Sequence, residues 1–150
     1  MLNTLETSNQ QLNALGSATD FADEIRPILS SLTLFEGFSE SECDAIFEYL
    51  QCYGAASNVT VLAEGDVGDF LLMVLTGRID VVKSDAKGQS RVVANIGPGG
   101  IIGEMSLIDG QHRFATCVTR EPTDFAVLTR DALNNIPVDR PRLGNKLLLI

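Results

Sequence analysis

From residue 53 onward, the sequence consists of short apolar runs separated by glycine and aspartate. Runs of this length, several of which alternate polar and apolar residues, predict a series of β-strands joined by turns. Short strands at this spacing favour a sandwich or barrel. The predicted strands are Val59–Leu62, Phe70–Leu75, Arg78–Lys83, Val92–Ile96, Ala115–Thr119 and Asp124–Leu128, with a hairpin loop at residues 84–89.

Helical patterns lie on both sides of the predicted strands. The segment Ser39–Glu42 has the capping-box pattern, in which a serine and a glutamate three residues later satisfy free backbone donors. The predicted helices run from Thr19–Asp20 through Leu29, from Ser39 to about Cys52, and from Arg130 to about Ile136, the last capped by Thr129 and ended by Pro137. We therefore expect an α+β fold, a β-sandwich flanked by N- and C-terminal helices.

The charge balance limits the partners of this chain. Twenty acidic and eleven basic residues give a net charge of −9, and no cluster of basic residues forms a surface for nucleic acid. No apolar run approaches the roughly 20 residues that span a bilayer, and the N-terminus lacks a secretory signal. We expect a cytoplasmic protein without direct contact to nucleic acid or membrane.

Metal chemistry and catalysis have little support in the sequence. Cys43, Cys52 and Cys117 lack the paired spacing of a zinc site or a disulfide framework, so we interpret them as small apolar side chains. His112 is the only histidine, and no nucleophile, base and carboxylate are suggested together. We predict no catalytic residue, no metal ligand and no cofactor.

One stretch, residues 103–116, has the layout of a small anion-binding site. It begins with Gly103-Glu104, continues through one apolar turn, breaks at Asp109-Gly110 and then presents Arg113. A helical turn starting near Glu104 would direct free backbone N–H groups outward, and these attract negative charge. An arginine can in addition bind two phosphate oxygens at once.

This stretch resembles the phosphate-binding cassette of the cyclic nucleotide-binding domain family. The resemblance covers roughly residues 32–150 and includes Leu34-Phe35, the turn Glu64–Asp69, Gly77 and Gly97–Gly99. It implies a cupin-like jelly roll, a double-stranded β-helix, that binds a cyclic nucleotide without altering it. The implied ligand is cAMP, and occupancy would be passed through the C-terminal helices to an effector domain in a longer chain or a partner protein.

The resemblance also assigns roles within the cassette. Arg113 would pair with the cyclic phosphate, Glu104 would accept a hydrogen bond from the ribose 2′-hydroxyl, and backbone groups of the cassette would supply further donors. The implied ligand-binding residues are Gly103, Glu104, Met105, Ser106, Arg113, Phe114, Ala115 and Thr116, with Leu72 or Val74, Val92 and Ala115 lining the pocket.

Two positions depart from the family pattern. His112 stands where proline is usual, and Phe114 stands where a small residue normally follows the arginine. Phe114 could crowd the ligand, or turn aside and stack on the base. We predict an altered nucleotide preference, with cGMP disfavoured because the family's guanine-contacting threonine is absent. Two alternatives are an interaction module in which Phe114 fills the pocket and a sensor of a different small anion.

The two ends of the chain carry the remaining predictions. Residues 1–18 are polar and read as an extension or linker with one weakly amphipathic helix, and residues 19–150 form the binding domain. Leu143–Ile150 resembles the start of the family's last helix and is strongly apolar. We expect this helix to be truncated, or to form the seam of a homodimer.

Overall fold

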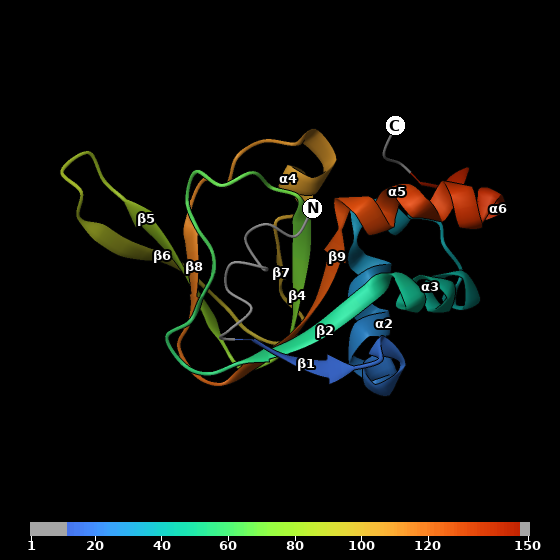
Figure 1. Cartoon of the computed structure of the whole chain (residues 1–150), viewed down its shortest axis with the longest axis horizontal. Coiled ribbons are helices and arrows are strands. Elements are labelled where there is room, and N and C mark those ends of the chain that lie inside the picture. Colours follow the sequence, from blue (N-terminus) through green and yellow to red (C-terminus); the bar gives the residue numbers. More distant parts are fainter. Residues whose placement is uncertain (1–11, 148–150) are drawn as a thin grey trace.

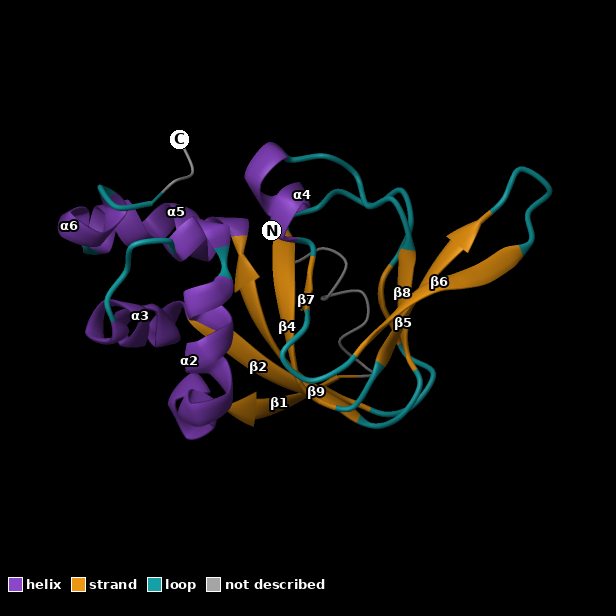
Figure 2. Ribbon diagram, turned by 180° about the vertical axis from the view of Figure 1, so that it is seen from behind, coloured by secondary structure: helices purple, strands orange, loops and turns teal. Residues whose placement is uncertain are grey.

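The computed structural model describes residues 12–147 and has three layers: a helical layer, a central sheet and an outer sheet (Figures 1 and 2). The central sheet has the strand order β1 (Leu12–Gly16), β2 (Leu50–Ala55), β9 (Thr123–Thr129), β4 (Phe70–Thr76) and β7 (Ile101–Ile102). The outer sheet has the order β3 (Thr60–Leu62), β8 (Thr116–Thr119), β5 (Ile79–Ser84) and β6 (Ser90–Ile96). All paired strands are antiparallel. This arrangement confirms the predicted α+β jelly roll.

The helices lie on the face of the central sheet that is turned away from the outer sheet, except for α4, which follows β7 (Figure 2). The α-helices are α2 (Ala22–Ser31), α3 (Glu40–Ile46), α4 (Glu104–Asp109), α5 (Arg130–Asp139) and α6 (Pro141–Gly144), and the 3₁₀ turns are η2 (Ala18–Phe21), η3 (Thr33–Phe35) and η4 (Phe47–Tyr49). Within residues 12–147, no helix is long and apolar enough to cross a membrane.

Strand β4 explains why the chain contains a continuous apolar run. Alternate side chains of a strand point to opposite faces of the sheet. Leu71, Met73 and Leu75 pack against the helices, whereas Phe70, Leu72 and Val74 pack against the outer sheet. Because both faces of β4 are covered, no position in its centre can be polar.

The strands predicted from the sequence are confirmed, with ends that differ by one or two residues. The hairpin loop is also confirmed, since β5 pairs with β6 across a turn in which the Asp85 carboxylate accepts from the backbone N–H groups of Lys87 and Gln89. Strands β2 and β7 are not predicted from the sequence, because β2 continues a helical apolar pattern and β7 is only two residues long.

The prediction for the N-terminal segment is wrong where the structure describes it. The leucine spacing predicts an extension with a weak helix, yet Leu12–Gly16 forms β1 and pairs with β2. The partner strand is distant in sequence, so local leucine spacing could not reveal the pairing. The next helical turn is capped by Ser17, whose side chain accepts from the Thr19 backbone N–H, and not by Thr19–Asp20. The part of the predicted helix before Leu12 lies outside the described residues.

Two of the predicted helix ends are also wrong. The capping box at Ser39 and Glu42 is present, but α3 ends at Ile46, and Leu50 already begins β2. At the other end of the chain, Thr129 caps α5 as predicted, but the helix continues past Pro137 to Asp139. Pro137 has no N–H to donate to the preceding turn, yet the last turn still closes, because the Arg140 backbone N–H donates to the carbonyl of Ile136 at 2.7 Å.

The C-terminal segment does not begin a long helix within the described residues. The sequence predicts that a helix begins near Leu143. In the structure the short helix α6 ends at Gly144. Leu143 and Leu147 are both buried in the cluster beneath the helices. Residues 148–150, the most apolar part of the predicted helix, lie outside the described residues.

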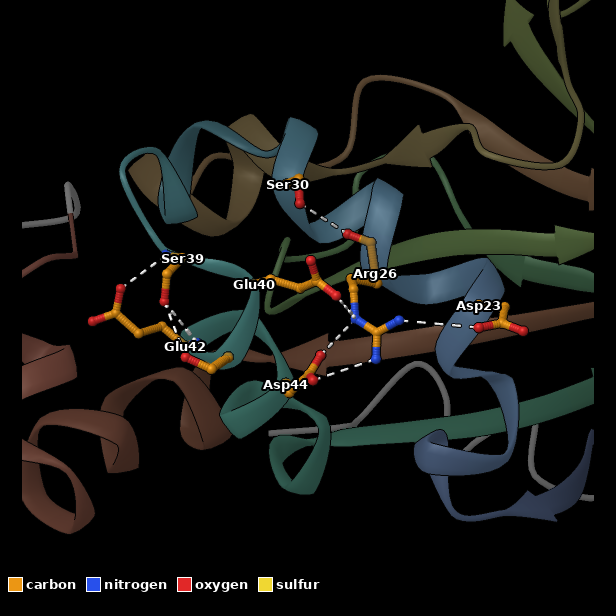
Figure 3. A network of polar contacts seen from close by, with 8 residues as sticks. Asp23, Arg26, Ser30, Ser39, Glu40, Glu42 and Asp44 are labelled. Atoms are coloured by element: carbon orange, nitrogen blue, oxygen red, sulfur yellow. Dashed lines mark hydrogen bonds and ion pairs between the residues drawn. The ribbon is translucent and has the colours of Figure 1, made fainter.

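Polar contacts hold the helical layer together. Arg26 of α2 binds the carboxylate of Asp44 on α3, with Nε 2.7 Å from Oδ1, and lies near Asp23 and Glu40 (Figure 3). The C-terminal segment is attached to the same layer through three contacts: Tyr49–Asp139 at 3.0 Å, Arg140–Glu48 at 2.9 Å and Lys146–Glu42 at 2.8 Å. Because these pairs lie at the surface and are partly exposed to solvent, each contributes little to stability by itself.

The three cysteines are free and buried, which confirms their interpretation as small apolar side chains. Cys43 and Cys52 belong to the core beneath the helices, and Cys117 belongs to the core between the sheets. Burial raises the pKa of the Cys52 and Cys117 thiols to about 11. Both are therefore protonated at neutral pH.

Candidate functional site

Arg113, in the loop between α4 and β8, is a buried cation. Its side chain is 4% exposed, its Nη2 donates to the carbonyl oxygen of Phe70, and its guanidinium carbon lies 4.7 Å from the centre of the Phe70 ring. Among residues 12–147, no hydrogen-bond partner exists for its buried Nε and Nη1. Buried donors without partners are costly, so these two nitrogens are prepared to bind an acceptor that the described chain does not supply.

The electrostatic environment of Arg113 also favours an anion. Burial lowers the pKa of the guanidinium, and the negative charge of Asp69 opposes that change. The group nevertheless remains protonated at any physiological pH. A bound anion would offset the cost of keeping this charge away from water.

The loop after β3 fixes the backbone around Arg113. The N–H of Arg113 donates to the carbonyl of Asp66 at 2.6 Å, its own carbonyl accepts from Gly65 at 2.8 Å, and His112 forms a β-bridge with Val67. The turn at residues 64–69 therefore holds the loop that carries Arg113 in place through backbone hydrogen bonds.

Gly103 allows α4 to begin directly beside the guanidinium. Its φ angle of 89° is in the left-handed region, and a Cβ atom added there would collide with Nη1 of Arg113. Gly68 is required for a similar steric reason, since an added Cβ would collide with the Cβ of Ser106. Glycine is required at both positions because backbone passes so close to other atoms.

A cavity of about 380 Å³ opens next to Arg113, between the outer sheet and the segment formed by β7 and α4. We call it the Arg113 cavity, and its size is within the range of small-molecule sites. Its lining is mostly apolar and consists of Leu62, Val81, Val93, Ala94, Ile96, Ile101, Ile102, Gly103, Ser106, Arg113, Phe114, Ala115 and Cys117.

The predicted lining of this pocket is largely wrong. Leu72 and Val74 are fully buried in the core between the sheets, and Val92 is 54% exposed. A β-bulge explains the error at Val92. The pairing of β5 with β6 shifts between Val81 and Val82, which face Ala94 and Val92, so Val93 is the extra residue of the bulge and lines the cavity in place of Val92. Of the predicted lining residues, Ala115 is placed correctly.

The structure brings five of the predicted ligand-binding residues to the Arg113 cavity, namely Gly103, Ser106, Arg113, Phe114 and Ala115. Glu104 and Met105 line a neighbouring cavity of about 380 Å³, which shares Ile101, Gly103, Ser106 and Phe114 with the first. The Glu104 carboxylate accepts weakly from the Leu34 backbone N–H, at 3.4 Å. Thr116 lines neither cavity, since its hydroxyl accepts from the Glu64 backbone N–H at 3.0 Å.

Phe114 turns outward and does not fill the pocket. Its side chain is 69% exposed, although the residue lies at the edge of both cavities. Lys83 of β5 holds this residue, because its Nζ donates to the Phe114 carbonyl at 2.6 Å and lies 5.9 Å from the centre of the ring. The Arg113 cavity is therefore open despite the large side chain.

Sequence reasoning missed Arg130, the first residue of α5. Its guanidinium donates to the carbonyl oxygens of Ser106 and Leu107 in α4, and its backbone N–H donates to the carbonyl of Asp69 at 2.8 Å. One arginine thus connects α5 to the cassette helix and to the loop beside Arg113. Nothing in the local sequence distinguishes it from an ordinary arginine in a first helical turn.

Taken together, the jelly roll, the open cavity and the buried arginine define a β-sandwich domain with a cavity suited to a small anion. Comparison with known proteins identifies the family within this class. The family model described as "Cyclic nucleotide-binding domain" matches residues 55–138, which is more than half of the chain. The chain belongs to the cyclic nucleotide-binding domain family.

Several relatives show what kinds of protein share this domain. A crystal structure of a cyclic nucleotide-binding domain from Methylobacillus flagellatus is 45% identical, with a TM-score of 0.81, covering 93% of this chain and 79% of that one. The regulatory domain of Toxoplasma gondii PKA, crystallised with cAMP, is 28% identical, with a TM-score of 0.70, covering 78% of this chain and 44% of that one.

The similarity to curated proteins is more distant. A CRP-like cAMP-activated global transcriptional regulator of Mycobacterium tuberculosis is 28% identical over 123 residues, covering 82% of this chain and 55% of the relative. The chain spans about half the length of the curated relatives it matches first. The similarity therefore concerns the regulatory nucleotide-binding domain and not the remaining parts of these proteins.

Proposed function

We propose that this domain is a sensor that binds cAMP in the Arg113 cavity without altering it chemically. The observation that carries the proposal is the buried guanidinium of Arg113, in which Nε and Nη1 have no partner in residues 12–147. A cyclic phosphate has one negative charge and two free oxygens, each of which can accept a charge-assisted hydrogen bond from an unpartnered guanidinium nitrogen. The apolar lining of the cavity suits a nucleoside.

The other cassette residues have proposed roles beside Arg113. Gly103 brings backbone close to the guanidinium, and Ser106 and Ala115 line the same cavity. The proposed ribose contact of Glu104 requires its carboxylate to serve the ligand from the neighbouring cavity, where it now accepts from Leu34. That bond is long and weak, so a ribose hydroxyl can compete for the carboxylate.

The outward position of Phe114 weighs against the alternative of a degenerate interaction module, because that alternative required its ring to fill the pocket. A sensor of another small anion remains a second candidate, since the same two guanidinium nitrogens would serve it. The large apolar lining favours a ligand that has an organic part as well as a charge.

Transmission of the signal is part of the proposal. The hydrogen bonds that join Arg130, the first residue of α5, to α4 support the proposal that a change around the cassette reaches the C-terminal helices. In this proposal the C-terminal helices have two arrangements in equilibrium. A ligand can shift that equilibrium only if it binds the two arrangements with different affinity. We propose that an effector domain or partner protein reads the position of these helices, and that a homodimer through the C-terminal segment is one form of that partner.

The test is calorimetric titration of the 150-residue chain with cAMP, alongside Arg113→Ala. We expect saturable binding by the wild type and an affinity loss of at least about a hundredfold in the variant, since charge-assisted hydrogen bonds are lost. Arg120→Ala is a matched control, because it removes the same charge from an exposed pair with Asp80 outside the cavity.

Two outcomes would contradict the proposal. One is the absence of binding heat at millimolar cAMP when the wild type is folded, and the other is equal affinity of wild type and Arg113→Ala. Titration with 5′-AMP and with inorganic phosphate separates the alternatives. Binding of inorganic phosphate as tight as that of cAMP would favour the sensor of another anion.

A further inference from the structure

Phe114 is an aromatic ring displayed at the opening of the proposed nucleotide site. It directly follows Arg113, yet Arg113 is buried, with 4% exposed, and Phe114 is 69% exposed. The ring borders both the Arg113 cavity and the neighbouring cavity. A ligand whose charged group reaches Arg113 would therefore have its remaining part near Phe114.

Lys83 fixes the place of this residue through two contacts with different origins. Its ammonium lies 5.9 Å from the centre of the ring, which is within the range of a cation–π contact. The same nitrogen donates to the Phe114 carbonyl at 2.6 Å and to Glu64 at 3.2 Å. One face of the ring is thus occupied by a cation that is itself anchored, and the ring is still mostly exposed.

A single exposed aromatic side chain is common on protein surfaces and needs no explanation by itself. Here three features coincide: the ring is next to the buried anion-binding arginine, it borders two cavities, and a cation supports it from one side. An aromatic face supported in this way is suited to stack on another flat ring, as bases do on aromatic side chains in single-strand binding proteins.

We propose that Phe114 is a stacking platform for the base of the ligand, and that it selects cyclic purine nucleotides over cyclic pyrimidine nucleotides. The inference rests on the proposed function, since it assumes that the cyclic phosphate binds Arg113. A purine has two fused rings and covers more of the phenyl face than a pyrimidine does. Lys83 is a positioning residue in this arrangement, because it acts on the ring and not on the base.

The experiment compares the affinities of cAMP and cyclic CMP, which carry the same ribose and cyclic phosphate. For the wild type we expect cAMP to bind several-fold more tightly, because every base can stack but the larger purine covers more of the phenyl ring. In Phe114→Ala both affinities fall, that for cAMP by about tenfold and that for cyclic CMP by less, so the ratio of the two approaches one. The Lys83–carbonyl hydrogen bond survives this change, because it involves only the backbone of residue 114.

Further variants separate stacking from general apolar contact. Phe114→Tyr keeps a ring and should retain the ratio, whereas Phe114→Leu keeps apolar bulk and should lose it. Lys83→Met should lower the ratio in part, because it releases the ring, while any loss of long-range attraction weakens both nucleotides equally. Lys87→Met, at the tip of the same hairpin, is the matched control, since no contact joins the Lys87 side chain to Phe114 in the described residues.

The possible failures are distinguishable. If the wild type binds both nucleotides and the ratio is unchanged in Phe114→Ala, the stacking platform is wrong while the proposed sensor survives. If Phe114→Leu keeps the full ratio, the preference does not come from stacking. If the folded wild type binds neither nucleotide, the proposed function fails together with this inference.

Discussion

The guanidinium of Arg130 donates a hydrogen bond to the carbonyl oxygen of Leu107, so the first residue of α5 caps the cassette helix α4. The same Nη2 atom lies 3.1 Å from the carbonyl oxygen of Ser106. The last carbonyls of a helix have no partner within it and carry partial negative charge, so a cation is stabilising there. The relationship joins the proposed ligand site to the helices that follow the sandwich.

We predict that Arg130→Met weakens the binding of cAMP by about tenfold and lowers the free energy of unfolding by about 1–3 kcal/mol, the usual contribution of hydrogen bonds to a charged group. Arg130→Lys should restore part of both, because an ammonium retains the charge. Calorimetric titration and urea unfolding measure the two effects. Unchanged affinity in a destabilised Arg130→Met protein would show that Arg130 serves the fold alone.

A second prediction concerns Gly103→Ala. The φ angle of 89° and the collision of a Cβ with Arg113 both oppose the change, so the guanidinium must move. We expect cAMP affinity to fall by more than about tenfold, as is common when a binding group is displaced by an ångström.

Gly88→Ala is the matched control for this prediction. Gly88 also has a positive φ, of 78°, but an added Cβ there has no atom within 4 Å. Both variants carry the backbone cost of about 1 kcal/mol for a left-handed residue. Thermal unfolding measures that shared cost, and equal affinities of the two variants would contradict the steric role of Gly103.

The pH dependence of stability provides a third prediction. Hydrogen bonds from Lys146, and then from the Ser39 backbone N–H, lower the pKa of Glu42 to about 2 in the folded protein, from an ordinary value of 4.5. Between these values the unfolded chain binds more protons than the folded chain. The contribution of this carboxylate is therefore complete above about pH 5 and is lost as the pH falls toward 2.

The variant that checks this is Glu42→Gln, which keeps a side chain able to complete the capping box. We expect a small decrease in melting temperature at pH 7, because the pair is exposed, and convergence with the wild type as the solution is acidified to pH 2. High salt should reduce the difference at pH 7. A difference that grows on acidification would contradict the assignment.

Much of the local structure could be predicted from neighbouring residues. Ser39 and Glu42 satisfy each other's backbone donors, and Thr129 caps α5, because a cap needs only residues within one turn. The strands β4, β5 and β9 could be predicted because burial imposes apolar runs or alternation on each one. The stretch from Gly103 to Thr116 could also be identified from the sequence, because it contains a glycine, a carboxylate and an arginine in the order of a small anion-binding site.

The structural features that were not predicted from the sequence depend on contacts with residues distant in the chain. Leu12–Gly16 became a strand because β2 offered a free edge, and Val93 lines the cavity because the pairing of β5 with β6 set its direction. Arg130 gained its partners when α5 packed beside α4.

The sequence by itself therefore determined the class of fold, the helix caps, most strands and the presence of an arginine where a phosphate could bind, since these depend on periodicity and on nearby residues. Only the tertiary structure decided that Arg113 is buried with two donors unpartnered in the described chain, that Phe114 turns outward onto Lys83, and that Thr116 lies outside the cavity. The physical reason is that burial, side-chain direction and hydrogen-bond partners are set by segments that meet only when the two sheets and the helical layer pack together.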